Sequence, residues 1–377
     1  MKRRFLRFIP ILGGHASVAQ VRPRTARFFD TIRKCLCAPK TVLRHHFVYG
    51  TNIFQIGIIS MFTIFTVEAS GIESVAGEPP VKLYVMAGQS NFGWSIRIDG
   101  MQQHASEVLD WIASDQNDVL YSWKKHETGK GSSSEGFVRL DSAEGMYAPD
   151  HLVAYHLSRY WEKQNPQQRI AIIKVQKGAT SLIQHWNPGG RKHWGEHYYK
   201  EGPLHATLVD QINAGIAQLE AAGIAWEGAG FFWYQGEGDA YDAGAKYAQL
   251  FKDLVYGGEF ETNAGTHRVQ GVLPMLQNPE APVIPVRISW HLHTVTRENA
   301  PPPGMWAKRT RAEWEPHLVQ VRDALTQFAT AHNGHDAAWV DVDDLPLKDR
   351  YHYDQSEAIT IGHRMAEAYL ALMTAGE

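Results

Sequence analysis

After residue 80, short apolar runs alternate with segments of helical periodicity. The apolar runs predict strands at 81–87, 169–175, 227–234, 283–289 and 338–342, and the segments between and after them predict helices at 150–163, 204–221, 240–256, 309–332 and 355–374. Continuous apolar strands separated by helices are typical of a parallel sheet that is covered on both faces. We therefore predict an α/β protein with three layers, α/β/α, around a five-stranded parallel sheet.

Residues 88–149 have no strong periodicity and are rich in Gly, Ser and Asp. A segment of this kind does not indicate a buried strand or a long amphipathic helix. We predict a long excursion over the top of the sheet.

The first 80 residues differ from the rest of the chain in composition. Residues 1–46 form a leader with eleven Lys and Arg against one acid, and residues 47–67 contain no charged side chain. This uncharged stretch of 21 residues is long enough to span hydrocarbon, and its basic flank predicts export of the body across a bacterial-type membrane. The protein is then periplasmic or extracellular.

Residues 47–69 fit either a signal peptide that is cleaved after Ala69 or an anchor that is retained at 47–67. A buried core helix in a cytoplasmic protein is the alternative to export. Residues 70–80 are small and polar and end in Pro79 and Pro80, which is typical of a linker. Residues 81–377 are predicted to form the functional domain.

Charge and cysteine content narrow the classes of function. The residues after the leader carry 26 basic and 39 acidic side chains, and this acidic balance argues against nucleic-acid binding. The only cysteines, Cys35 and Cys37, lie in the leader, so the body is predicted to fold without disulfides. Their spacing is too short for a zinc site.

Polar segments follow each of the five predicted strands. In open parallel sheets, ligands bind beyond the carboxyl ends of the strands, so we expect these segments to meet at one edge. They are Gly88–Asn91, Lys177–Ser181, Trp233–Glu237, Trp290–His293 and Asp349–His352.

Ser90, Asp349 and His352 match the residue types of a catalytic triad, in the order Ser…Asp…His. A serine needs a base to remove its proton, and a carboxylate can hold the histidine in the tautomer that acts as base. Asp354 is a rival for the carboxylate, and a turn-forming or helix-capping serine is the plain alternative for Ser90. The sequence lacks a G-x-S-x-G motif, which argues against an α/β-hydrolase.

Ester hydrolysis passes through an oxyanion that requires preplaced N–H donors. Candidates are the backbone amides of Ser90 and Gly178 and the side-chain carboxamide of Gln235. The simpler interpretation of Gly178 is a turn glycine, and that of Gln235 is a solvated loop residue.

Four further residues are predicted to contact the substrate. They are Asn91, Trp186, Glu237 and His291. Trp186 belongs to an aromatic-rich loop, 182–199, whose rings suit either the apolar face of a sugar or the packing of the loop itself. Glu237 also suits a supporting hydrogen bond, and no metal or cofactor is predicted, because no recognisable ligand signature is present.

Four motifs together resemble the SGNH-hydrolase superfamily, and more narrowly its sialate O-acetylesterase and acetylxylan esterase branch (carbohydrate esterase family six). They are LYVMAGQSNFGW at 83–94, the segment around Gly178, WYQGEGD at 233–239 and DDLPLKDRYHYD at 343–354. The resemblance spans about 81–375 and implies a flavodoxin-like sheet, a Ser90–His352–Asp349 triad and the oxyanion donors named above. Tyr234 departs from the family, which commonly has His before Gln-Gly-Glu.

The sequence thus predicts a serine esterase that removes O-acetyl groups from carbohydrates such as acetylated xylan or sialic acid. A non-catalytic carbohydrate-binding protein is one alternative, although a decayed enzyme usually lacks part of its triad. A lipase or thioesterase on the same fold is the other, and it would prefer longer acyl chains.

Overall fold

The computed structural model describes residues 77–125, 132–143, 145–194, 197–198, 200–241, 243–292, 310–331 and 336–375. The described residues belong to one compact unit, Thr66–Glu377. Its strands are β1 (Val81–Gly88), β2 (Ile96–Arg97), β3 (Leu120–Lys125), β4 (Ser132–Ser133), β5 (Val138–Arg139), β6 (Met146–Tyr147), β7 (Ile170–Gln176), β8 (Lys192–Trp194), β9 (His197–Tyr198), β10 (Trp226–Tyr234), β11 (Gly258–Thr262), β12 (Gly265–Val269) and β13 (Val283–Pro285). Its helices are α1 (Ile98–His104), α2 (Ser106–Ala113), α3 (Pro149–Gln164), α4 (Pro203–Ala221), α5 (Gly244–Tyr256), α6 (Val272–Met275), α7 (Arg311–Ala331) and α8 (Gln355–Ala375), with short 3-10 turns η2 (Ser90–Phe92) and η3 (Asp239–Tyr241).

The central sheet has the strand order β13-β10-β1-β7-β3-β4, and β5 also pairs with β3. The strands β13, β10, β1, β7 and β3 run parallel, whereas β4 and β5 are antiparallel to β3. The predicted α/β class with a mostly parallel sheet is confirmed. In β1 and β7 every residue except Lys82 is buried, as expected of strands that are covered on both faces.

The sheet corrects two predictions about individual strands. Region 88–149 is not only an excursion, because it contains β3, the fifth parallel strand of the sheet. Only the first half of β3 is fully buried, so its apolar signal in the sequence is short. The predicted strand at 338–342 pairs with the 283–286 segment only through isolated parallel bridges, Val283 to Ala337 and Val286 to Val340.

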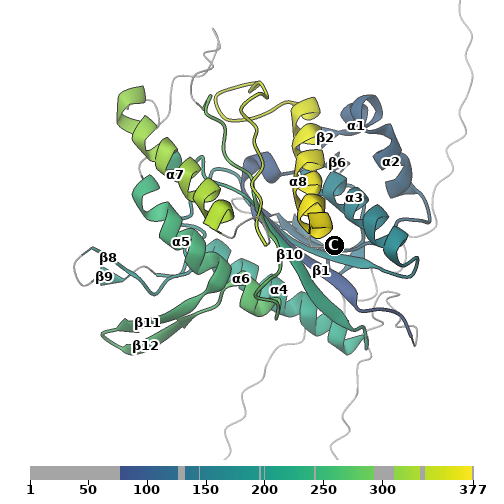
Figure 1. The fold of residues 1–377 in the computed structure, drawn as a ribbon, viewed down its shortest axis with the longest axis horizontal. Coiled ribbons are helices and arrows are strands. Elements are labelled where there is room, and N and C mark those ends of the chain that lie inside the picture. Colours follow the sequence, from purple (N-terminus) through teal and green to yellow (C-terminus); the bar gives the residue numbers. More distant parts are fainter. Residues whose placement is uncertain are drawn as a thin grey trace, which may run out of the picture. The chain divides into compact units, whose positions relative to one another are not determined.

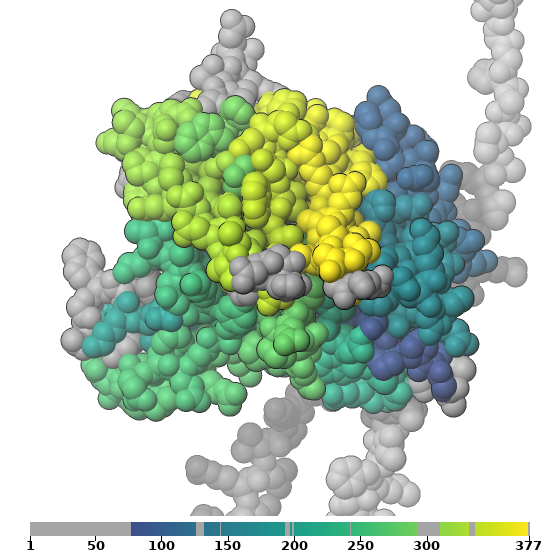
Figure 2. Space-filling view, viewed as in Figure 1, coloured from purple at the N-terminus to yellow at the C-terminus, as the bar shows by residue number. Residues whose placement is uncertain are grey.

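Helices cover both faces of the sheet. Helices α3 and α8 pack against each other on one side, and α4, α5 and α7 lie on the other, with α5 against α7 (Figure 1). The space-filling view shows α8, in yellow, directly beside α3 (Figure 2). The five predicted long helices are confirmed, with the predicted 240–256 helix beginning at Gly244 after the short turn η3.

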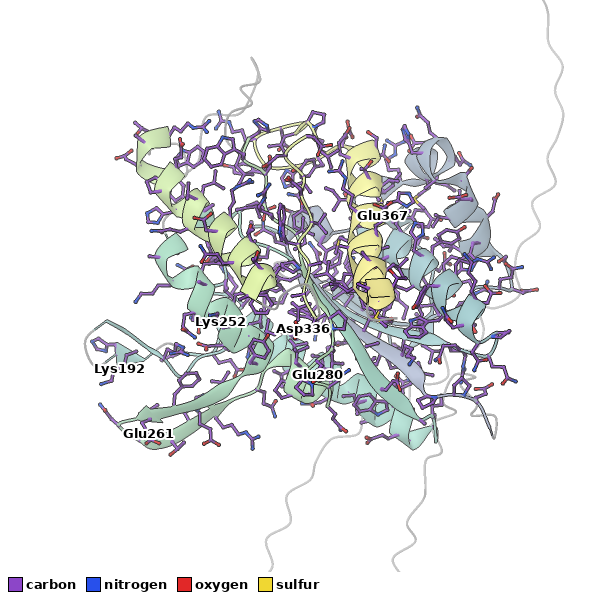
Figure 3. The ribbon with its side chains drawn as sticks, viewed as in Figure 1. Lys192, Lys252, Glu261, Glu280, Asp336 and Glu367 are labelled. Atoms are coloured by element: carbon purple, nitrogen blue, oxygen red, sulfur yellow. The ribbon has the colours of Figure 1, made fainter. Side chains whose placement is uncertain are left out.

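Three of the charged side chains labelled in Figure 3 are exposed. Lys192 and Glu261 lie on the two hairpins β8–β9 and β11–β12, and Glu367 lies on α8 (Figure 3). Within the described ranges, no helix is both long and apolar enough to cross a membrane. The uncharged segment at 47–67, and with it the predicted anchor or signal peptide, lies outside the described residues.

Candidate active site

The carboxyl ends of three adjacent strands bring together segments that are distant in the sequence. Gly88, at the end of β1, pairs with Gln176 of β7 on one side and with Tyr234 of β10 on the other. The strands must approach closely here, since a Cβ on Gly88 would lie 2.3 Å from the backbone oxygen of Tyr234. The next residue, Gln89, donates its backbone N–H to that same oxygen at 2.9 Å. This close pairing positions the turn that carries Ser90.

Ser90, His352 and Asp349 form a continuous hydrogen-bonded chain. Nε2 of His352 lies 3.1 Å from Oγ of Ser90, although 262 residues separate the two in sequence. Nδ1 of His352 lies 3.0 Å from Oδ2 and 3.1 Å from Oδ1 of Asp349. With Nδ1–H donating to the carboxylate, Nε2 is available to accept the serine proton.

A tight loop brings the acid and the imidazole together. An antiparallel bridge between Leu347 and Tyr353 closes the loop, and Lys348 donates its amide to the carbonyl oxygen of His352 at 2.8 Å. The Asp349 carboxylate accepts the backbone N–H groups of Tyr351 and His352, each at 2.8 Å. Partial burial opposes ionisation, but these bonds and the imidazole hold the pKa of Asp349 below its usual value.

Asp354, the alternative carboxylate for His352, is bonded to the backbone instead. Asp354 is exposed, and it accepts the backbone N–H of Gln355 at the start of α8. Its backbone oxygen accepts the amide of Ala358. The geometry therefore pairs His352 with Asp349, in agreement with the prediction made from their spacing.

The two predicted backbone donors for the oxyanion are the amides of Ser90 and Gly178. Gly178 adjoins the serine, because a Cβ added to it would lie 3.4 Å from the Cβ of Ser90. Within the described part of the chain, neither the Ser90 amide nor the Gly178 amide donates to another backbone oxygen. The following residue, Ala179, has a left-handed backbone with φ of 57°. Both predicted backbone donors are thus next to the nucleophile candidate.

The structure corrects the prediction that Gln235 supplies an oxyanion donor. Its side chain is fully buried, and Nε2 donates to the Thr180 backbone oxygen at 3.0 Å and to Oδ2 of Asp239 at 2.7 Å. Both partners only accept hydrogen bonds, so they determine which way the carboxamide points. Gln235 therefore holds neighbouring loops, and its two N–H groups are already occupied.

The structure also corrects the prediction that Trp186 contacts the substrate. Its side chain is fully buried, its indole N–H donates to Oγ1 of Thr180 at 3.0 Å, and its ring packs edge-on against Trp233. A ring with no exposed surface cannot stack on a sugar, so the packing alternative is the correct one for this residue. His291 is exposed and follows β13, where a contact with substrate stays a prediction.

Asn91 and Glu237 lie beneath the surface of the site. Asn91 is 7% exposed and Glu237 is 5% exposed, and the Asn91 carboxamide N–H donates to Oε1 of Glu237 at 2.6 Å. Glu237 therefore makes the supporting hydrogen bond that its position suggested. Burial, together with the charge of Asp239, raises the pKa of Glu237 to about 7 against the hydrogen bonds that favour its charged form.

One acidic residue, Asp239, and one aromatic residue, Tyr234, have structural roles near the site. Asp239 accepts the backbone N–H groups of Leu182 and Ile183 and so fixes the loop that follows Gly178. Tyr234 is fully buried, and its ring packs against Phe92 in η2. In the described portion of the chain, no three His, Cys, Asp or Glu side chains are grouped to hold a metal ion.

A buried ion pair beneath the nucleophile turn was not anticipated from the sequence. Lys174 of β7 is bonded to Asp150 of α3, and both side chains are completely buried. The Lys174 ammonium lies 4.0 Å from the centre of the Trp94 ring and 4.9 Å from that of Phe92. A lysine inside an otherwise apolar strand was the signal in the sequence.

Comparison with known families accords with this geometry. The family of carbohydrate esterases described as sialic acid-specific acetylesterases matches residues 80–371. The chain belongs to this family. It is therefore a carboxylic ester hydrolase of the carbohydrate acetylesterase class, and the matched region contains Ser90, Gly178, Asp349 and His352.

Several solved structures are similar to the chain at low identity. A protein from Arabidopsis thaliana has 17% identity and a TM-score of 0.43, with 78% of this chain and 99% of that chain covered. The carbohydrate acetylesterase XAC1771 from Xanthomonas citri has 14% identity and a TM-score of 0.44, with 78% and 57% covered. NanS has 14% identity and a TM-score of 0.46, with 80% and 100% covered. No curated protein matches the chain significantly.

Proposed function

We propose that this protein is a serine esterase that removes O-acetyl groups from carbohydrates through an acyl-enzyme. The observation that carries the proposal is the hydrogen-bonded chain from Oγ of Ser90 through His352 to Asp349, with distances of 3.1 and 3.0 Å. Membership of the carbohydrate esterase family supports the substrate class. Acetylated xylan, O-acetylated sialic acid and related glycans are the proposed substrates.

The first half-reaction forms the acyl-enzyme. Oγ of Ser90 attacks the acetyl carbonyl carbon while Nε2 of His352 accepts the hydroxyl proton. The resulting oxyanion accepts hydrogen bonds from the amides of Ser90 and Gly178. The bond to the sugar oxygen then breaks, and His352 returns its proton to that oxygen. Asp349 stabilises the imidazolium and keeps the proton on Nδ1.

The second half-reaction releases acetate. His352 removes a proton from water, and the hydroxide attacks the acetyl carbon of the acyl-enzyme. The tetrahedral intermediate uses the same two amides. Its collapse breaks the bond to Oγ, which recovers the proton from His352, and acetic acid leaves as acetate.

The direct test compares two serine variants of the purified protein on p-nitrophenyl acetate, acetylated xylan and O-acetylated sialic acid. Ser90→Ala is expected to abolish turnover above background, because removal of the nucleophile eliminates the acyl-enzyme. Ser181→Ala is the matched control, since Oγ of Ser181 also lies near a histidine, 3.3 Å from Nδ1 of His185. This control is expected to keep most of the activity.

Two measurements complete the test. Trapping with a radiolabelled serine-directed fluorophosphonate is expected to label the wild type and Ser181→Ala but not Ser90→Ala. A series of p-nitrophenyl esters from acetyl to octanoyl is expected to favour acetyl. Equal turnover by Ser90→Ala and the wild type would refute the serine mechanism, and preference for octanoyl would favour a lipase or thioesterase.

A further inference from the structure

A second hydrogen bond runs beside the one that joins Ser90 to His352. Nδ2 of Asn91 donates to the backbone oxygen of Tyr351 at 2.9 Å, across 260 residues of sequence. Asn91 directly follows the serine, and Tyr351 directly precedes the histidine. The two loops of the triad are therefore tied together by neighbours of the reacting residues.

The carboxamide of Asn91 is itself held in place. Its other N–H donates to Oε1 of Glu237 at 2.6 Å, a bond that is buried on both sides. Glu237 belongs to the loop after β10, so this one carboxamide joins three separate loops. Because both partners of Nδ2 are acceptors, the orientation of the carboxamide is determined by the structure.

Glu237 is buried, although it belongs to a loop, and only 5% of the residue is exposed. Its Oε2 has no hydrogen-bond partner among the described residues. The titratable groups around it are the Asp239 carboxylate and the hydroxyls of Tyr234, Tyr247 and Tyr353. Whether the carboxyl group is ionised or protonated at Oε2, Oε1 can still accept from Asn91.

We propose that Asn91 and Glu237 are positioning residues, which set the distance between Ser90 and His352 rather than bind substrate. Asn91 ties the serine turn to the histidine loop, and Glu237 holds the Asn91 carboxamide in the orientation that makes this tie. The proposal rests on the serine mechanism given above. It replaces the substrate-contacting role that the sequence suggested for both residues.

Removal of either group is expected to reduce kcat without weakening substrate binding. Asn91→Ala and Glu237→Leu are each expected to reduce kcat by about 10- to 100-fold, because a displacement near 1 Å between reacting groups has an effect of this size. KM is expected to change by less than about twofold, since uniform binding is unaffected. Glu237→Gln keeps an acceptor oxygen and is expected to stay within about twofold of wild-type kcat from pH 5 to 9.

A double-mutant cycle tests whether Glu237 acts through Asn91. If it does, Asn91→Ala combined with Glu237→Leu is expected to be no slower than Asn91→Ala alone. The matched control is Asn117→Ala. Asn117 is also buried, with 2% of it exposed, and it donates to two backbone oxygens, those of Ile112 and Leu140. We expect that variant to lose thermal stability but to keep its kcat.

Each outcome decides the proposal. Unchanged kcat in both variants, a loss that appears mainly in KM, or additive losses in the double variant would each overturn it. Circular dichroism and thermal unfolding show which variants are folded. If Glu237→Leu fails to fold, Asn91→Ala still tests the expected loss of kcat, and Glu237→Gln still tests whether an acceptor oxygen at position 237 preserves kcat. Failure of the serine mechanism itself is separate, because it would appear as activity in Ser90→Ala.

Discussion

At the scale of single residues, the chemistry depends on which carboxylate faces His352. Asp349 and Asp354 flank the same histidine in the sequence, but only Asp349 approaches Nδ1 of the ring, at 3.0 Å. The backbone N–H groups that Asp349 also accepts keep it oriented and favour its charged form. The backbone of its own loop therefore holds the carboxylate in the orientation that pairs it with the imidazole.

We expect Asp349→Asn to fold normally and to reduce kcat by up to about 10⁴, because an amide favours the wrong imidazole tautomer. Asp354→Asn is the matched control, and Glu237→Gln is a second one. Both should keep kcat near that of the wild type. The measurement is kcat and KM of the three variants on one acetyl ester, with circular dichroism as the check on folding. A crippled Asp354→Asn beside an active Asp349→Asn would reassign the acid.

At the scale of elements, the nucleophile turn rests on a charged pair that joins β7 to α3. Lys174 supplies the cation and Asp150 the anion, and Tyr121 of β3 donates its hydroxyl to Oδ2 of Asp150 at 2.6 Å. Burial disfavours both charges, yet Lys174 and His151 hold the pKa of Asp150 well below its usual range. Removal of one partner would leave the other charge buried without compensation.

Lys174→Met is therefore expected to lower the free energy of unfolding by about 3–5 kcal/mol. Lys82→Met is the matched control on the adjacent strand, because its partner, Glu227, is 48% exposed. There we expect a loss of about 1 kcal/mol or less. Urea unfolding monitored by circular dichroism measures both values, and equal losses would contradict the argument.

The pH dependence of the Lys174→Met deficit follows from the ionisation of Asp150. In the wild type its folded pKa is depressed, so its stabilising contribution is present above the unfolded value of about 3.9 and is lost as the pH falls through the lower folded pKa. In the variant, burial without Lys174 should raise that pKa. The deficit is therefore expected to shrink as the pH is lowered from 7 toward about 4.

At the scale of the whole molecule, we propose that residues 47–69 direct export and leave the esterase domain outside the cytoplasm. The basic leader before an uncharged stretch of 21 residues supports this orientation. In a bacterial host, the full chain is expected in the periplasmic, extracellular or membrane fraction. A variant without residues 47–69 is the control and should stay in the cytosol.

The N-terminus of the exported protein distinguishes the two forms of export. A new N-terminus at Ser70 would indicate a cleaved signal peptide, whereas an intact chain in the membrane fraction would indicate an anchor. Recovery of the full-length, uncleaved chain in the cytosol would overturn the proposal.

The sequence by itself determined the α/β class, the long helices and four strands of the parallel sheet. Those features depend on the local periodicity of apolar residues and on continuous apolar runs. Both patterns can be recognised in a short window of the sequence. It also indicated Ser90, Gly178, Asp349 and His352, because these residues follow predicted strands and carry the required chemistry. Asp349 and His352 are close in sequence, so a single turn suffices to pair them.

Only the tertiary structure decided the place of β3 and the roles of the polar residues behind the site. The burial of Trp186, the occupied N–H groups of Gln235 and the bond from Asn91 to Tyr351 each depend on residues from other elements. Whether a side chain is exposed to substrate or bonded within the protein is a property of its surroundings. Contacts across up to 260 residues leave no local pattern, and packing alone creates them.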